Sequence, residues 1–182
     1  MRTADLSSRS AFRARIAAVP GNVWLISISL LVYAFFAQGI ILQSGASPTF
    51  RIDLSPLLTA GLAIQVHVVA AIATFAIGVV LLTAPKGFGL HRTLGWTWVV
   101  CMAVTAGSSF FITAIFQTHY SPIHALSAWT MLGLPMGIAA VRRRDIAGHR
   151  KKMTGMFVGG MVVAGLFSLL PGRLMWTIFF AA

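Results

Sequence analysis

The chain alternates between long apolar runs and short segments that carry its charge. No Asp, Glu, Lys or Arg occurs in residues 16–50, 54–85, 93–141 or 153–172. A helix needs about 20 predominantly apolar residues to cross a bilayer, and the run 93–141 is long enough for two. The pattern predicts an all-α polytopic membrane protein with five transmembrane helices.

Clusters of Gly, Pro and Ser set the boundaries of these helices. The breaks fall at QSGASPTFRIDLS, APKGFG and QTHYSP, and a polar link, VRRRDIAGHRKK, separates the last two helices. The expected helices are about 23–42, 56–83, 91–116, 122–141 and 149–170. A Pro-Gly pair should end the last helix. The interfacial tail 171–182 is too short to cross and should lie along the surface or fold back.

The segment before the first helix, residues 1–22, carries four arginines and one aspartate. A secretory signal is one reading of a basic start followed by an apolar run. However, the run that follows is about 20 residues long, whereas the apolar part of a signal has about 7–15. We therefore expect a cytoplasmic basic segment, 1–22, followed by a transmembrane domain, 23–182, with an uncleaved first helix.

The basic residues give the orientation of the five helices. With the amino terminus inside, 12 of the 14 Lys and Arg residues fall on the inner side, and only Arg51 and Arg173 fall outside. An excess of Lys and Arg in short inner loops is what sets orientation in membranes. The carboxyl terminus is then expected on the periplasmic side.

Composition supports this class and excludes others. Apolar residues make up 58% of the chain and charged residues 9%, against about 25% charged in soluble domains. The net charge of +11 does not indicate nucleic acid, because the basic residues flank apolar runs and form no stripe with aromatic residues. Cys101, the single cysteine, forms no disulfide framework and is expected to be a small buried hydrophobic residue.

Four of the five histidines repeat one arrangement. His67 lies inside one apolar run and His91 opens the next, 24 residues later; His124 and His149 repeat this with a spacing of 25 residues. The repeat predicts two matched helical hairpins, as in membrane proteins built from parallel repeats. Helices two to five would then form an antiparallel four-helix bundle, in which two and four face each other diagonally, as do three and five.

This bundle would hold two pairs of imidazoles. Measured from the inner charged edge, His67 and His124 differ in height by about 1.5 Å, in the outer half of the membrane, and His91 and His149 are level at the inner edge. Two level histidines on opposed helices supply the two axial ligands that six-coordinate haem iron requires. The sequence therefore predicts haem b bound by His67 with His124 and by His91 with His149.

Small residues are expected to shape the space between the helices. Ala71, Thr74 and Gly78 lie on the helical face of His67 and should leave room towards the bundle centre. Gly133–Gly137 and Gly155–Gly159 are GxxxG pairs, which let helix backbones approach closely. They form either a dimer seam or, as we favour, contacts within one chain.

Each histidine also has a simpler interpretation. His91 and His149 lie at headgroup depth, where interfacial side chains reach towards phosphates. His67 is an ionisable group inside hydrocarbon, which points to function, although a hydrogen bond to Thr74 or to a facing serine would also satisfy it. His124 lies near the outer surface, where a role at the helix start is equally compatible.

The helix count, the pairing of helices and the histidine spacing resemble those of dihaem b-type membrane cytochromes. Ligands in those proteins also pair helices two with four and three with five. The resemblance implies electron transfer across the membrane, with a quinone or another membrane redox partner exchanging the electrons.

Four motifs, KGFGLHRTLGW, SPIHALSAW, HRKKM and LLPGRLM, resemble a bacterial family of predicted integral membrane proteins with no assigned activity. The resemblance covers roughly residues 60–176. It implies a location in the bacterial inner membrane and places His67, His91, His124 and His149 at motif positions.

Other functions are weighed by the polar residues inside the spans. A protease or a proton-coupled transporter would place charged side chains there, and the runs have none. No HExxH or similar close spacing indicates zinc. Two alternatives remain open: a non-catalytic subunit or assembly partner of a membrane complex, and a small transporter with a site around His67 and His124.

Overall fold

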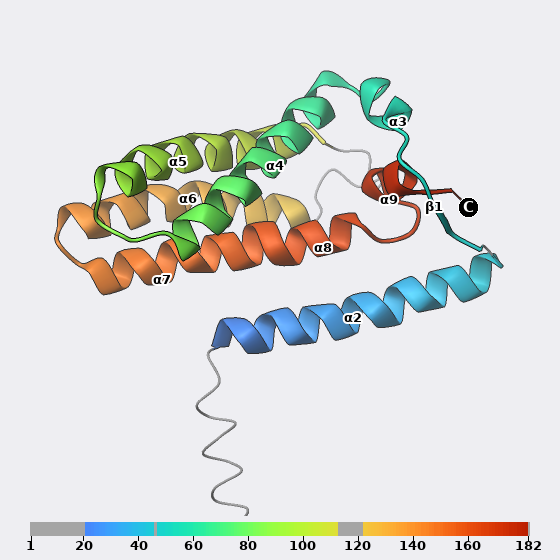
Figure 1. Ribbon diagram of the computed structural model, residues 1–182, viewed down its shortest axis with the longest axis horizontal. Coiled ribbons are helices and arrows are strands. Elements are labelled where there is room, and N and C mark those ends of the chain that lie inside the picture. The colour runs from blue at the N-terminus through green and yellow to red at the C-terminus, as the bar shows by residue number, and fades with distance from the viewer. Residues whose placement is uncertain (1–20, 46, 113–121, 182) are drawn as a thin grey trace, which may run out of the picture.

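The computed structural model describes residues 21–45, 47–112 and 122–181, and this part of the chain is almost entirely helical (Figure 1). The all-α prediction is confirmed. Most of the predicted basic segment, 1–22, and all of His119 lie outside the described residues. The long elements are α2 (Gly21–Ser44), α4 (Leu62–Thr83), α5 (Gly89–Ser109), α6 (Pro122–Arg142), and the continuous run of α7 (Ile146–Met156), η1 (Phe157–Val163) and α8 (Ala164–Ser168).

The second predicted helix, 56–83, is divided in two. A short helix, α3 (Ser55–Leu58), starts with a proline in its first turn, and α4 begins after Gly61, whose extended backbone caps it. Gln65 explains why this break is stable. Its side-chain amide donates to the carbonyls of Leu58 and Ala60, both at 2.9 Å, so groups freed by the break are satisfied.

Helix α5 ends at Ser109, well before the predicted end at 116. The hydroxyl of Ser108 donates to the carbonyl of Val104 at 2.7 Å, and that of Ser109 donates to Ala106 at 2.7 Å. The backbone then tightens, because the amides of Phe110 and Phe111 bond to carbonyls three residues earlier. Such side-chain bonds to the backbone compete with helix continuation, which the apolar pattern alone does not reveal.

The last long helical run starts at Ile146, three residues before the predicted start. Asp145 caps it, because its carboxylate accepts a hydrogen bond from the amide of Gly148 at 2.8 Å. Arg144 reverses the chain just before the cap with a positive φ of 63°. The run widens to a π-helix over η1, a local widening that is often found at functional sites.

We expect Asp145→Ala to lower stability by about 1 kcal/mol, the usual loss for a helix N-cap. The carboxylate satisfies an amide that has no partner in the helix. Thermal unfolding in detergent measures the change. Asp145→Asn keeps a capping oxygen and should lose clearly less; equal losses in both variants would contradict the role of the cap.

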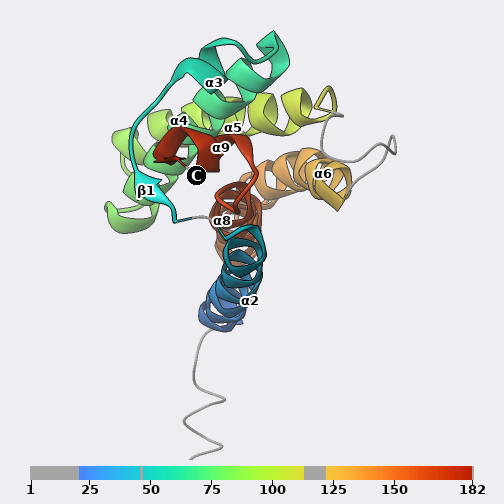
Figure 2. The ribbon, with the colours of Figure 1, turned by 90° about the vertical axis from the view of Figure 1, so that its right-hand side faces the viewer.

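Neighbouring helices pack in sequence order and close on themselves. Helix α4 contacts α5, α5 contacts α6, α6 contacts α7, and η1 returns to contact α4. Figure 2 shows α2 outside this group, beneath α8. Among the described residues, helix α2 contacts mainly η1 and α8. Tyr33 donates a hydrogen bond to the carbonyl of Leu169 at 3.1 Å.

The carboxyl-terminal tail folds back on the first loop. Helix α9 (Leu174–Phe179) leads into β2 (Phe180–Ala181), which pairs antiparallel with β1 (Thr49–Phe50). Phe50 meets Phe180 edge to face, with ring centroids 6.0 Å apart. Of the two arrangements expected for the tail, folding back is the one observed.

Methionines fill the notches left by glycines in the core. The core cluster contains Trp98, Met102, Leu134, Met156, Phe157, Val158 and Met161. A Cβ atom on Gly133 would lie 2.9 Å from the sulfur of Met156, and one on Gly160 would lie 2.8 Å from the methyl group of Met102. The contacts at Gly133 and Gly160 are therefore made within one chain, as we favoured for the first GxxxG pair.

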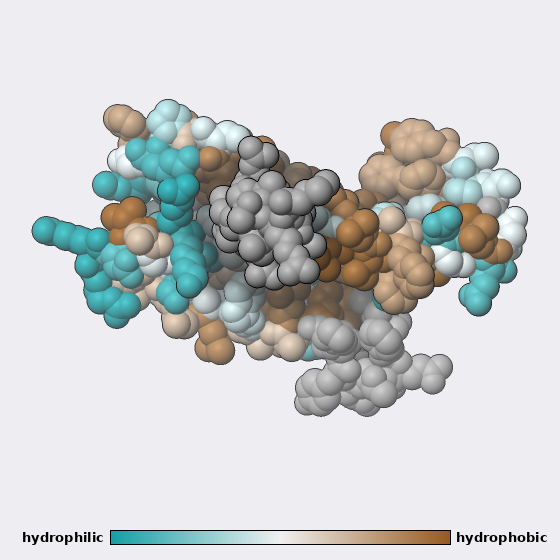
Figure 3. All heavy atoms as spheres, turned by 90° about the horizontal axis from the view of Figure 1, so that it is seen from below, coloured by the Kyte–Doolittle hydropathy of each residue, from teal (hydrophilic) through white to brown (hydrophobic). Residues whose placement is uncertain are grey.

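Three helices among the described residues are long and apolar enough to cross a membrane: Val23–Ser44, Leu62–Thr83 and Ile123–Arg142. Five were expected. Helix α5 carries the polar residues His91 and Arg92 in its first turn, and the last helical run is divided between α7, η1 and α8. Neither segment is therefore a single long apolar helix. Figure 3 shows an apolar middle and a strongly hydrophilic end, where the described basic residues of the α4–α5 and α6–α7 turns lie.

Candidate functional site

His67 is held by the neighbouring helix. Its Nδ1 lies 2.9 Å from the carbonyl oxygen of Thr105 and 3.2 Å from the hydroxyl oxygen of Ser108, both in α5. A carbonyl oxygen only accepts hydrogen bonds, so Nδ1 carries the proton. In the neutral ring, Nε2 then keeps its lone pair. The facing serine expected as a partner for His67 is present, and the stronger partner is a main-chain carbonyl.

His149, at the opposite end of the helices, has the same kind of partner. Its Nδ1 lies 2.9 Å from the carbonyl oxygen of Gly137 in α6. The same argument places the proton on Nδ1 and the lone pair of the neutral ring on Nε2. Histidines that bind metals almost always donate their other N–H in this way, to a carbonyl or a carboxylate. Two of the four predicted ligands thus have Nδ1 bonded to a main-chain carbonyl, as metal-bound histidines usually do.

His91 lies near His149 at the basic end of the helices. It precedes the charge-free run that begins at Thr93, outside the apolar part of α5. His149 and Lys86 lie close enough to His91 to act on its ring electrostatically. Its Nδ1 is buried and has no hydrogen-bond partner among the described residues. The two histidines predicted as a pair therefore influence each other.

His67 contacts α5, and His124 contacts Phe110, the residue that follows α5. The ring of His124 lies against Phe110, with centroids 6.0 Å apart, whereas His67 bonds to Thr105 and Ser108. Two to five residues along a helix correspond to about 3–8 Å. The two histidines therefore touch different parts of this segment, and the pairing of His67 with His124 stays a prediction.

The space beside Gly78 is filled, contrary to our expectation. A Cβ atom there would collide with the ring of Phe157 and would lie 3.0 Å from Nε1 of Trp98. Thr74, one turn away, is fully buried and lies 3.5 Å from the hydroxyl of Thr105. The small residues after His67 admit bulky neighbours from α5 and η1, so they leave no open room towards the centre.

A group of buried hydroxyls links three helices, and the sequence reasoning missed it. Its members are Thr74, Thr105, Ser109, Ser127 and Thr130, each at most 5% exposed. Ser109 and Ser127 hydrogen-bond across α5 and α6. Each hydroxyl oxygen also lies within hydrogen-bond distance of a carbonyl of its own helix three or four residues earlier. The available signal was small polar residues at helical spacing inside apolar runs.

The described residues contain no group of three or more His, Cys, Asp or Glu side chains that could hold a metal ion. A bis-histidine haem site would have only two protein ligands, so it would not form such a group. Cys101 is half-buried, more exposed than expected, and its carbonyl accepts the hydroxyl of Thr105 at 2.8 Å.

Apolar helices, a basic end and histidines fixed inside the helix packing define this protein as an α-helical membrane protein. A family described as "Predicted membrane protein (DUF2306)" matches residues 64–180, and the chain belongs to it. The match covers the four long helical segments after α2 and all four predicted ligands. No curated protein and no solved structure matches the chain significantly.

Proposed function

We propose that the protein crosses the bacterial inner membrane five times, with its amino terminus in the cytoplasm, and carries electrons across it on haem b. His91 with His149 would hold the inner haem, and His67 with His124 the outer one. Haem iron, once bound, would accept and release single electrons. The chain would hold the ligands at fixed heights and exclude water from them.

The observation that carries this proposal is the matched environment of His67 and His149. Each donates Nδ1–H to a carbonyl of the adjacent helix at 2.9 Å. This bond fixes the orientation of the ring and increases the basicity of Nε2. An interfacial histidine that only reaches towards lipid phosphates would not need such a partner inside the protein.

The donor set of the inner pair fits haem iron. The buried Nδ1 of His91 has no hydrogen-bond partner among the described residues, so this ring, unlike that of His149, is not oriented by a bond to the protein. The outer pair has one oriented ring, His67. For both rings to reach one iron, His124 would have to come level with His67, and Phe157 and Trp98, which fill the space beside Gly78, would have to make room.

Helix lengths support five spans. Helix α5 has 21 residues, and α7, η1 and α8 together run without a break from Ile146 to Ser168. At about 1.5 Å per residue, each is about as long as the roughly 30 Å hydrocarbon core. The closed contacts between α4, α5, α6 and the last run favour the antiparallel bundle that the histidine repeat predicts.

Absorption spectra test the proposal. The protein would be purified from haem-replete cells and scanned in the visible region, first oxidised and then reduced with dithionite. We expect the sharpened bands of reduced low-spin haem b, with up to two haems per chain. A colourless preparation would overturn the proposal. In that case, fixed companion proteins that copurify would favour the role of a non-catalytic subunit.

Helix α2 is the specific observation that favours the subunit role. Most of its large apolar side chains are exposed, among them Leu31, Phe35 and Leu42, each more than 70%. Lipid covers such a surface in a solitary protein, and a companion helix covers it in a complex. Crosslinking from position 35 to another protein, in a preparation that lacks haem, would support the second role.

A further inference from the structure

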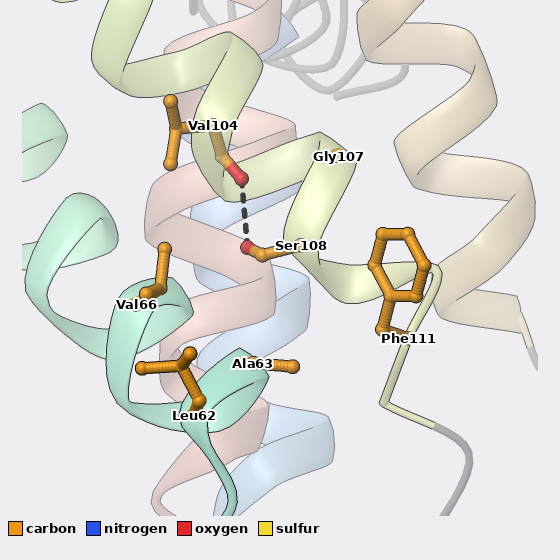
Figure 4. Close-up of a pocket in the computed structure, with 7 residues that line it drawn as sticks. All are labelled: Leu62, Ala63, Val66, Val104, Gly107, Ser108 and Phe111. Carbon is orange, nitrogen blue, oxygen red and sulfur yellow. Dashed lines mark hydrogen bonds between the residues drawn. The ribbon is translucent and has the colours of Figure 1, made fainter.

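A groove opens between α4 and α5 beside His67. Leu62, Ala63, Val66, Val104, Gly107, Ser108 and Phe111 line it, and its volume is about 420 Å³. This lies within the roughly 300–1,000 Å³ of small-molecule sites. The wall is apolar except for Ser108, whose hydroxyl faces the groove between the two helices (Figure 4).

The hydrogen bonds of Ser108 define what can bind there. Its hydroxyl donates to the carbonyl of Val104 at 2.7 Å, with the carbonyl of Thr105 also within reach at 3.1 Å. Nδ1 of His67 lies 3.2 Å from the hydroxyl oxygen, and its N–H is shared between this oxygen and the carbonyl of Thr105. A hydroxyl has one hydrogen and two lone pairs, so one lone pair remains. A ligand that hydrogen-bonds to Ser108 must therefore be the donor. The acyl chain of a lipid cannot do this, and neither can a carbonyl.

The shape of the groove favours a flat ring. Gly107 has no side chain, and a Cβ atom on it would meet nothing within 4 Å, so the wall is open there. Phe111, which is 77% exposed, offers an aromatic face beside it (Figure 4). A ring could lie on Gly107 and pack against Phe111, since aromatic pairs add about 0.5–1.5 kcal/mol beyond the burial of area.

We propose that this groove binds the head of a membrane hydroquinone, with a ring hydroxyl donating to the oxygen of Ser108 and the isoprenoid tail among Leu62, Val66 and Val104. The oxidised quinone has only carbonyl acceptors at these positions and lacks the donor. Through Ser108, the bound hydroxyl is connected to His67 by hydrogen bonds. The role of the bound hydroquinone as an electron donor rests on the proposed function. Binding of the hydroquinone in the groove does not depend on it.

Thermal unfolding of the full chain in detergent tests the site, with decylubiquinol kept reduced, decylubiquinone and dodecane as probes. A ligand that binds the folded state raises its melting temperature with concentration. We expect the largest shift with decylubiquinol. Ser108→Ala should weaken binding about 2- to 10-fold, the loss of one hydrogen bond. Gly107→Leu should fill the groove and abolish the shift.

Gly165→Leu is the matched control, because Gly165 in α8 lies outside the groove and an added Cβ there also meets nothing within 4 Å. In this variant decylubiquinol should raise the melting temperature as much as in the unmodified protein. Equal shifts with the quinone would contradict the hydrogen bond to Ser108, and equal shifts with dodecane would indicate an acyl-chain groove. A shift that survives Gly107→Leu would place the ligand elsewhere. Haem content is measured on the same sample. Quinol binding without haem would contradict only the proposed function, and haem without quinol binding would contradict only the proposed groove.

Discussion

His149→Ala is expected to remove one haem per chain and to leave the other. Its Nε2 would be an axial ligand of the inner haem, and its Nδ1 is already bonded to the carbonyl of Gly137 at 2.9 Å. Without the ring, the iron loses one of its two strong protein ligands. The haem content should fall to about half, measured by absorption against protein concentration, while the bands of the outer haem remain.

His67→Ala is the companion variant, and it should remove the outer haem instead. His119→Ala provides the control, because it replaces the one histidine that stands outside the repeat. We expect full haem content in that variant. If His149→Ala and His67→Ala both retained full haem content, the predicted ligand pairs would be wrong.

Gly78→Ala is expected to destabilise the protein by about 1–3 kcal/mol, the usual range for overpacking a close-packed core. The added methyl group would collide with the ring of Phe157 and would approach Nε1 of Trp98 at 3.0 Å. Phe157 is only 6% exposed and Trp98 only 4%, so neither ring can swing out into lipid without opening the core. Thermal unfolding in detergent measures the loss.

Gly155→Ala should act in the opposite direction. Gly155 is exposed, and an added Cβ meets nothing within 4 Å. Alanine is favoured over glycine inside a helix by about 0.8–1 kcal/mol, so we expect a higher melting temperature. Equal destabilisation in both variants would show that the position of Gly78 against Phe157 is not what matters.

The sequence predicted the helices well where apolar runs are bounded by charge. Helix α6 was expected at 122–141 and is found at Pro122–Arg142. Boundaries inside apolar runs were missed, because they depend on hydrogen bonds of single side chains. Gln65 stabilises the break before α4 through the carbonyl of Leu58, and the hydroxyl of Ser109 helps to end α5. Neither changes the apolar pattern.

The sequence predicted which histidines form the candidate site, but only part of their surroundings. The spacing of His67 and His149 suggested ligands, but their carbonyl partners, Thr105 and Gly137, lie on other helices. A main-chain carbonyl leaves no trace in the sequence. The space beside Gly78 was misjudged for a related reason: a glycine on the inner face admits a neighbouring ring as readily as it leaves a cavity.

The central claim is that two pairs of imidazoles bind haem iron from both sides, with one ring of each pair, His67 or His149, held by an Nδ1–H bond to a carbonyl. Electron paramagnetic resonance of the oxidised, haem-replete protein tests it most directly, because the signal of ferric haem depends on both axial ligands. We predict a low-spin signal of bis-imidazole type, lost in part in His149→Ala. A high-spin signal, or purified protein without haem iron, would contradict the account.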